Sequence, residues 1–229
     1  MASRFLLVAL AAVLAGCDLS GRVEGEIEAA LPRAIGPAES YEATVEGLRA
    51  RSGEADVVRI VGRRVRPEGS PTLDRLDLDL RGVRYDRGDR RIERAERATG
   101  RVRVLPADLA AFLEARDDIA EASVALRPPA AATVRLRPDL TDVALLRGVT
   151  AEVRGTLRPD SGRVYLDVTS VRAAGIGLGG TVARALGDRI NPVVDLGDRG
   201  PDLRVTRLAV EDGALVLDAE ADVDGLRLR

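Results

Sequence analysis

Apolar and polar side chains alternate along most of the chain after residue 37. Leu76, Leu78 and Leu80 are separated by charged residues, and the alternation changes phase at Gly82, after which Val83 is apolar. Because successive side chains of a strand point to opposite faces, the pattern predicts strands with one dry face, and the phase change predicts a bulge or bend. Strands of this kind are typical of antiparallel sheets. Similar runs occur at residues 98–104, 124–126, 134–136, 149–157, 164–168, 203–205 and 215–221.

Three segments follow a helical period instead. In the first, Ile27, Leu31 and Ile35 recur every four residues, Ser20 is placed to cap the helix, and Gly36-Pro37 ends it. A second helix is expected from residue 106 and a third from about residue 181 to 191. The apolar faces of these two helices carry Leu109, Phe112 and Leu113, and Val182, Leu186 and Ile190.

Together these elements predict one α+β domain over residues 17–229, with a long antiparallel sheet whose dry face is covered by the helices. No linker, low-complexity stretch or repeat divides this part of the sequence. The first helix carries Glu24, Glu26 and Glu28, which disfavour contact with an anionic lipid surface. We therefore expect that helix to pack against the domain.

The amino terminus has the pattern of a bacterial lipoprotein leader. Arg4 precedes an apolar run over residues 5–15, which is too short to span a bilayer. Leu14-Ala15-Gly16-Cys17 resembles a lipobox, which predicts cleavage after residue 16 and lipidation, including palmitate, at Cys17. Residues 1–16 are thus a predicted signal peptide, and the mature protein is expected outside the cytoplasm, anchored to a membrane on the periplasmic or outer cell surface. The alternative is a signal peptide followed by an incidental cysteine.

Composition excludes several classes of function. The 229 residues contain one Cys and no His, so neither a disulfide nor a Cys/His zinc site is available within the chain. All 35 basic residues are Arg and are interspersed with 37 acidic residues, giving a net charge of -2. With three Tyr, two Phe and no Trp, the chain also has few stacking platforms, so we expect no nucleic-acid partner.

Three motifs resemble known sites but favour ordinary structure. The sequence over 175–180 fits the dinucleotide-binding motif G-x-G-x-x-G. The strand before it, however, alternates polar and apolar residues, unlike the buried parallel strand of a dinucleotide-binding fold, so a flexible Gly-rich start to the helix is preferred. Asp160-Ser161-Gly162 has no second copy to form an aspartic-protease dyad and is interpreted as a turn. The paired carboxylates Asp77/Asp79 and Glu211/Asp212 lack the aromatic platforms of a sugar site. We predict no catalytic residue, metal site or cofactor.

The order of elements resembles the LmeA-like phospholipid-binding family over nearly the whole mature chain. The likeness lies in the 23–27 helix, the strands at 53–65 and 73–86, the Leu105-Pro106-Ala107-Asp108-Leu109 helix start and the closing hairpin at 203–220. This resemblance implies a curved sheet wrapped around two or three amphipathic helices, in an envelope protein that binds phospholipid. For some members it implies a role in envelope glycolipid assembly. The family offers no catalytic residues to carry over.

Binding an acyl chain requires a dry groove that the protein's own side chains leave unfilled. The sequence predicts a non-catalytic lipoprotein that binds phospholipid acyl chains in an aliphatic cavity, in a role of envelope lipid handling. The alternative is a scaffolding lipoprotein with a closed core and a protein-contacting surface. Candidate lining residues come from three strands and the last helix: Leu76, Leu78, Leu80, Val164, Leu166, Val168, Val182, Leu186, Ile190, Leu215 and Leu217.

Overall fold

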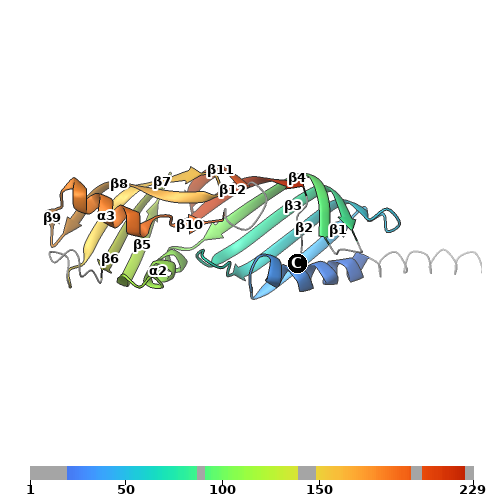
Figure 1. The fold of residues 1–229 in the computed structure, drawn as a ribbon, viewed down its shortest axis with the longest axis horizontal. Coiled ribbons are helices and arrows are strands. Elements are labelled where there is room, and N and C mark those ends of the chain that lie inside the picture. Colours follow the sequence, from blue (N-terminus) through green and yellow to red (C-terminus); the bar gives the residue numbers. More distant parts are fainter. Residues whose placement is uncertain (1–19, 87–90, 139–147, 197–202, 225–229) are drawn as a thin grey trace, which may run out of the picture.

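The computed structural model describes residues 20–86, 91–138, 148–196 and 203–224. The predicted signal peptide, residues 1–16, and the predicted lipidation site Cys17 lie outside the described residues. The molecule is elongated, with two antiparallel sheets arranged along its long axis (Figure 1).

The first sheet contains six strands in the order β1-β2-β3-β4-β12-β11. Gly82 in β3 has a φ of +59°, and both Leu80 and Val83 are buried, so the predicted change of phase is confirmed. The hairpin between β11 and β12 turns at Asp212 and Gly213, which both have positive φ, as a two-residue turn of this type requires. The strand bounds are Ser40–Glu46 (β1), Glu54–Val65 (β2), Leu73–Asp86 (β3), Arg91–Val104 (β4), Leu203–Glu211 (β11) and Ala214–Asp224 (β12).

The second sheet has the strand order β10-β8-β7-β6-β5, and a short β9 pairs with β8. Every pairing in it is antiparallel. Its inner face is almost entirely aliphatic, because each strand contributes alternate residues such as Val134 and Leu136 of β6. The bounds are Ile119–Arg127 (β5), Ala131–Pro138 (β6), Ala151–Asp160 (β7), Arg163–Ala173 (β8), Ile176–Gly177 (β9) and Val194–Asp195 (β10).

Three helices accompany the sheets within the described residues: one over 20–34, α2 over Pro106–Glu114 and α3 over Gly180–Ile190. Pro106 occupies the first turn of α2, where its missing N–H costs nothing, and α3 ends before Pro192. The α+β class, the antiparallel pairing and the three helices are thus confirmed. The strands form two sheets rather than the one long sheet that the sequence predicted.

The two sheets meet at β11. The Val205 amide donates a hydrogen bond to the Ser161 carbonyl at 3.1 Å, and the Val210 amide donates to the Pro129 carbonyl at 2.8 Å. The turns of the second sheet therefore satisfy amides of the first sheet's edge strand. The larger hydrophobic cluster continues across this junction and includes Leu217 of β12 together with residues of both sheets.

The helix over 20–34 covers the opposite end of the first sheet. Leu31 is buried in a second hydrophobic cluster, which the helix closes. The Ala43 amide of β1 donates to Glu28 Oε1 at 2.8 Å, and the Val45 amide donates to Glu24 Oε1 at 2.9 Å. The helix therefore packs against the domain as expected, and two of its carboxylates occupy the free edge of β1. Within the described residues, none of the helices combines the length and the apolar character that crossing a membrane requires.

Candidate functional site

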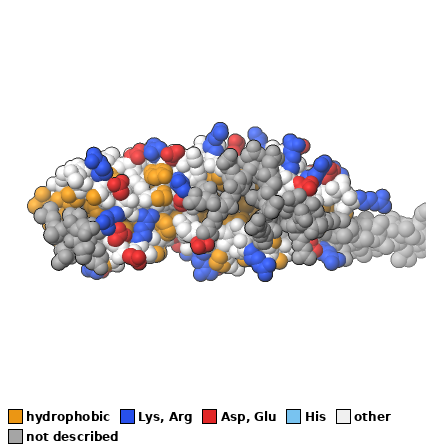
Figure 2. All heavy atoms as spheres, viewed as in Figure 1, with side chains coloured by type: hydrophobic (Ala, Val, Ile, Leu, Met, Phe, Trp, Pro, Cys, Tyr) orange, Lys and Arg blue, Asp and Glu red, His pale blue; other side chains and the backbone are white. Residues whose placement is uncertain are grey.

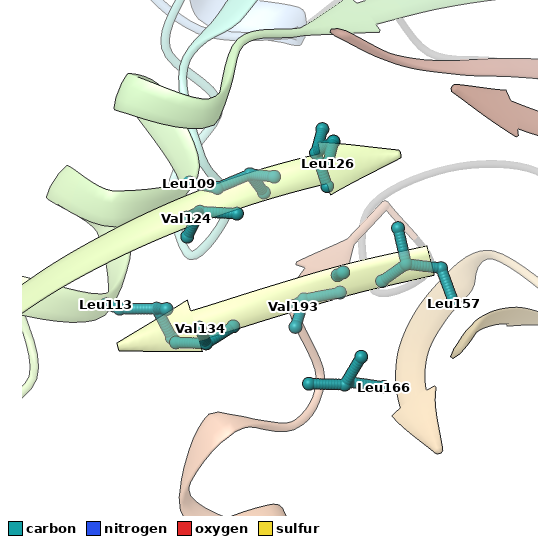
Figure 3. A pocket seen from close by; sticks show the side chains of 9 residues that line it. Leu109, Leu113, Val124, Leu126, Val134, Leu157, Leu166 and Val193 are labelled. Atoms are coloured by element: carbon teal, nitrogen blue, oxygen red, sulfur yellow. The ribbon is translucent and has the colours of Figure 1, made fainter. Parts of the chain in front are cut away.

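An apolar crevice lies between α2 and the inner face of the second sheet. The side chains around it come from α2, from the four strands β5 to β8 and from the segment before β10, and they point toward one another (Figure 3). All of them are hydrocarbon side chains, so the crevice offers no polar or titratable group to a ligand. The lining residues are Leu109, Leu113, Val124, Leu126, Ala132, Val134, Leu157, Leu166 and Val193.

The crevice is nearly closed. Its volume is about 10 Å³, which is about the room that one water molecule needs. Leu113 and Leu166 are buried, whereas Val124 and Leu126 on β5 are only partly buried. In this structure the crevice is too small to hold an acyl chain, and the open cavity expected from the sequence stays a prediction.

The partly buried side lies along β5, which is an edge strand of the second sheet. The Ala122 amide on that edge donates to Glu114 Oε1, at the end of α2, at 2.8 Å. This hydrogen bond holds α2 against β5, so the crevice is bounded on one side by a helix and on the other by a sheet edge.

A set of polar contacts, here termed the clasp, joins the turn after α2 to the end of α3. The clasp consists of Arg116, Asp118, Arg189 and Pro192. Arg116 donates hydrogen bonds to the carbonyls of Arg189 and Pro192, the latter at 2.8 Å, and Arg189 pairs with Asp118 at 2.7 Å. Burial lowers the pKa of Arg116 below its ordinary value, with Asp118 opposing the shift, and its guanidinium lies 5.1 Å from the Phe112 ring centroid. A half-buried cation thus holds the end of α3 to the turn after α2, the helix that lines the crevice.

The position of α3 is fixed mainly at its carboxyl-terminal half. Leu186, Gly187 and Ile190 are buried, and a Cβ at Gly187 would lie 3.3 Å from Val168 Cγ2, so helix and strand approach closely there. The Asn191 side chain accepts from the Leu166 amide at 2.7 Å and donates to its carbonyl at 3.1 Å. The amino-terminal half of α3 has no side-chain cap and is only partly buried.

The other motifs lie away from the crevice and have structural partners. Ser161 and Gly162 form the turn between β7 and β8, and the Gly-rich 175–180 segment forms β9 and the start of α3, after an antiparallel strand. Asp77 and Asp79 accept hydrogen bonds from arginines on their own strand. Among the described residues, no three His, Cys, Asp or Glu side chains are grouped closely enough to hold a metal ion.

A family model described as LmeA-like phospholipid-binding matches residues 11–220. The chain belongs to this family. The predicted resemblance is thus confirmed over nearly the whole sequence. No curated protein and no solved structure matches the chain.

Most of the lining residues predicted from the sequence belong to the hydrophobic cluster that contains the crevice. Leu166 is the predicted residue that lines the crevice itself. In the same large cluster, buried around it, are Leu76, Val164, Leu186, Ile190, Leu215 and Leu217. Leu78, Val168 and Val182 are partly buried against that cluster, whereas Leu80 belongs to the second cluster beneath the helix over 20–34. The structure thus places most of the set in one hydrophobic cluster, and one of its members, Leu166, lines the crevice.

Sequence reasoning missed eight residues of the crevice, including Leu109, Leu113 and Leu126. The apolar face of α2 and the alternation in β5 and β6 were both visible in the sequence. What the sequence lacked was the pairing of α2 with β5, which determines that these two faces meet.

Proposed function

We propose that this LmeA-like protein binds phospholipid by taking acyl chains into the crevice between α2 and the second sheet, without catalysing a reaction. The observation that supports the proposal is a wholly hydrocarbon lining next to a partly exposed sheet edge, in a chain of a phospholipid-binding family. A buried methylene contributes ~0.8 kcal/mol, so a chain of ~16 methylenes needs a dry environment worth on the order of 13 kcal/mol. Aliphatic side chains supply that environment.

Binding requires the crevice to widen. Ligand sites commonly have volumes of about 300–1,000 Å³, far above the volume of the closed crevice. The clasp connects the end of α3 to the turn after α2, and the amino-terminal half of α3 is the less firmly held part. We infer that α2 and α3 separate when an acyl chain enters, with Leu113 moving off the sheet.

The cellular setting of the proposal is the envelope. Cleavage after residue 16 and acylation of Cys17 would leave the protein on a membrane surface outside the cytoplasm, where it handles envelope lipid. Cys17→Ser in the full chain should abolish incorporation of labelled palmitate in cells. Continued labelling of that variant would refute the anchor.

A matched pair of substitutions tests the crevice. Ala132 lines it and is 5% exposed, while Ala98 on β4 is 6% exposed and belongs to the other cluster. Ala132→Leu adds volume to a crevice with almost no free space, so bound phospholipid, extracted and measured by mass spectrometry, should fall about tenfold. Ala98→Leu should change the amount of bound phospholipid by less than about twofold. Equal lipid content in the two folded variants would place the acyl chains elsewhere.

One observation favours a second function, that of a scaffolding lipoprotein: the crevice is nearly closed in this structure. A scaffold with a closed core would carry no lipid of its own. Protein prepared without detergent and extracted with organic solvent separates the two functions. Stoichiometric phospholipid in the extract supports acyl binding, and an extract without phospholipid supports the scaffold.

A further inference from the structure

The segment of residues 172–184, here termed the tip, lies at the end of the molecule farthest from the first sheet (Figure 1). Ala174 and Gly175 have φ values of +49° and +82° and form a two-residue turn. This turn folds β9 back on β8, so that Arg172 faces Gly177 and Ala173 faces Ile176. Figure 1 shows β9 and the start of α3 at the left end of the molecule, opposite the blue helix over 20–34.

The tip exposes hydrocarbon to solvent. Ile176 is 69% exposed, and it is the one large hydrophobic side chain among the described residues with that degree of exposure. Leu178 is partly buried against the larger cluster, and hydrophobic side chains are visible at this end of the surface (Figure 2). Ile176 and Leu178 therefore give the tip a small apolar surface. Because single exposed hydrophobic residues are common, this surface indicates a contact site only together with the charges beside it.

Glycine is required at only part of the tip. Gly175 has the positive φ that favours glycine, but Gly177, Gly179 and Gly180 do not, and a Cβ at each of these three would meet nothing within 4 Å. Neither backbone conformation nor steric crowding explains these three glycines, which reduce the stability of a folded segment. They leave Ile176 and Leu178 as the only side chains within the Gly-rich segment 175–180.

The tip carries arginines and no carboxylate of its own. Many arginines elsewhere pair with neighbouring carboxylates, as Arg75 does with Asp77 at 2.6 Å. The sequence from 168 to 187 contains Arg172 and Arg184 but no Asp or Glu. Both arginines are exposed, and within the described part of the chain neither has an ion pair. The tip therefore combines hydrocarbon with uncompensated positive charge.

We propose that the tip docks on the surface of a phospholipid bilayer that contains anionic lipids. Ile176 and Leu178 enter the interface between headgroups and acyl chains, and Arg172 and Arg184 lie at the phosphates. A protein partner fits less well, because a stable interface usually buries about 800 Å² on each side and the tip offers one exposed large hydrophobic side chain, Ile176. The surface is separate from the acyl crevice, although Leu178 and the crevice residue Leu166 belong to one continuous hydrophobic cluster.

The chain contains no Trp, so one substitution gives a site-specific probe. In the full chain carrying Ile176→Trp and Cys17→Ser, emission should shift to the blue on adding phosphatidylcholine vesicles with a quarter phosphatidylglycerol, and lipids brominated on the acyl chain should quench it. The matched control is Thr206→Trp on β11, at an exposed position, whose emission should stay unchanged. Unchanged emission from the Ile176→Trp chain overturns the proposal. If the emission shifts to the blue when the protein concentration is raised without vesicles, the partner is a second copy of the chain. That result also overturns the proposal.

Charge is tested by a second matched pair. Arg172→Gln with Arg184→Gln should lower the vesicle partition coefficient about 25-fold, since each Arg near an anionic surface contributes about fivefold. Arg127→Gln with Arg204→Gln removes the same charge from exposed positions on β5 and β11. This control pair should change the partition coefficient by less than about threefold. Equal losses from the two pairs would show a general charge effect and overturn docking by the tip. Because Ala132→Leu affects the crevice and leaves the tip intact, failure of acyl binding and failure of docking are distinguishable.

Discussion

Arg64 and Asp108 form a bidentate ion pair, with both terminal nitrogens of the guanidinium 2.7 Å from the two carboxylate oxygens. The pair connects β2 of the first sheet to the first turn of α2. The Asp108 side chain is 9% exposed, and the hydrogen bond to it raises the pKa of Arg64. A carboxylate in the first turn is also stabilised by the helix dipole. This contact therefore fixes the helix that covers the crevice.

Loss of the pair should destabilise the fold. We expect Asp108→Ala to lower the free energy of unfolding by about 1–3 kcal/mol, because Arg64 loses its main partner in a half-buried place. Asp77→Ala, which removes a partly exposed partner of Arg75, should cost about 0–1 kcal/mol. Urea denaturation of both variants measures the difference, and equal losses would show that the Arg64 pair is an ordinary surface contact.

The free edge of β1 provides a second prediction. Glu28→Ala leaves the Ala43 amide without its acceptor, which should cost about 1–2 kcal/mol and promote edge-to-edge association, detected by light scattering. Glu26 lies on the same helix but pairs only with Arg22, at 3.7 Å, and both side chains are exposed. Glu26→Ala should therefore behave like the unsubstituted protein. Association of both variants to the same extent would contradict the role given to Glu28.

The clasp predicts a kinetic effect. Arg116→Met removes the hydrogen bonds to the carbonyls at the end of α3 and retains much of the apolar stem, so the helices should separate more readily. We expect uptake of a fluorescent phospholipid to become about 5–20-fold faster, since hydrogen bonds from a charged group contribute about 1.5–3 kcal/mol, of which part is lost on opening. Arg137→Met, which removes an exposed pair with Glu121, is the control. Slower uptake by the Arg116 variant would show that the clasp shapes the site instead of restraining it.

Tyr41 predicts the response to alkali. Burial raises its pKa to about 12, and its hydroxyl donates to the Gly36 carbonyl at 2.7 Å. The folded state therefore favours the neutral phenol, so the contribution of Tyr41 to stability is complete below pH ~10 and declines between pH ~10 and ~12. The chain has no lysine and three tyrosines, so few other groups titrate in this window. Urea denaturation at rising pH should show this decline, and Tyr41→Phe should show a flatter profile. The same slope in both proteins would assign the decline to another group.

The sequence predicted local structure well where a few residues determine it. Pro106 marked the start of α2, Gly82 marked the change of phase, and the Asp212–Gly213 turn was evident from residue types that tolerate positive φ. The split into two sheets was missed, since alternation shows which face of a strand is buried but not which strand is its neighbour. β9 was missed because two residues are too few to show a period.

The lining of the crevice also depends on which elements are neighbours, and alternation within a strand does not show this. Leu76 on β3 and Leu126 on β5 occupy equivalent places in their alternating patterns, yet Leu126 lines the crevice and Leu76 is buried in the cluster around it. Leu80, two residues farther along β3, belongs to the other cluster altogether. Which of these leucines lines the crevice depends on the tertiary contacts between α2 and β5, and the pattern of a single segment does not predict those contacts.

The most direct measurement is photochemical mapping of the bound lipid. The full chain is loaded with a phospholipid that carries a photoreactive group at the end of one acyl chain, irradiated, digested and sequenced by mass spectrometry. We expect adducts on peptides that contain α2, β5 and β6, with Leu109, Leu113, Leu126 and Val134 among the labelled residues. Adducts confined to β1, β2 and the helix over 20–34 would contradict this expectation, because they would place the acyl chain in the other hydrophobic cluster.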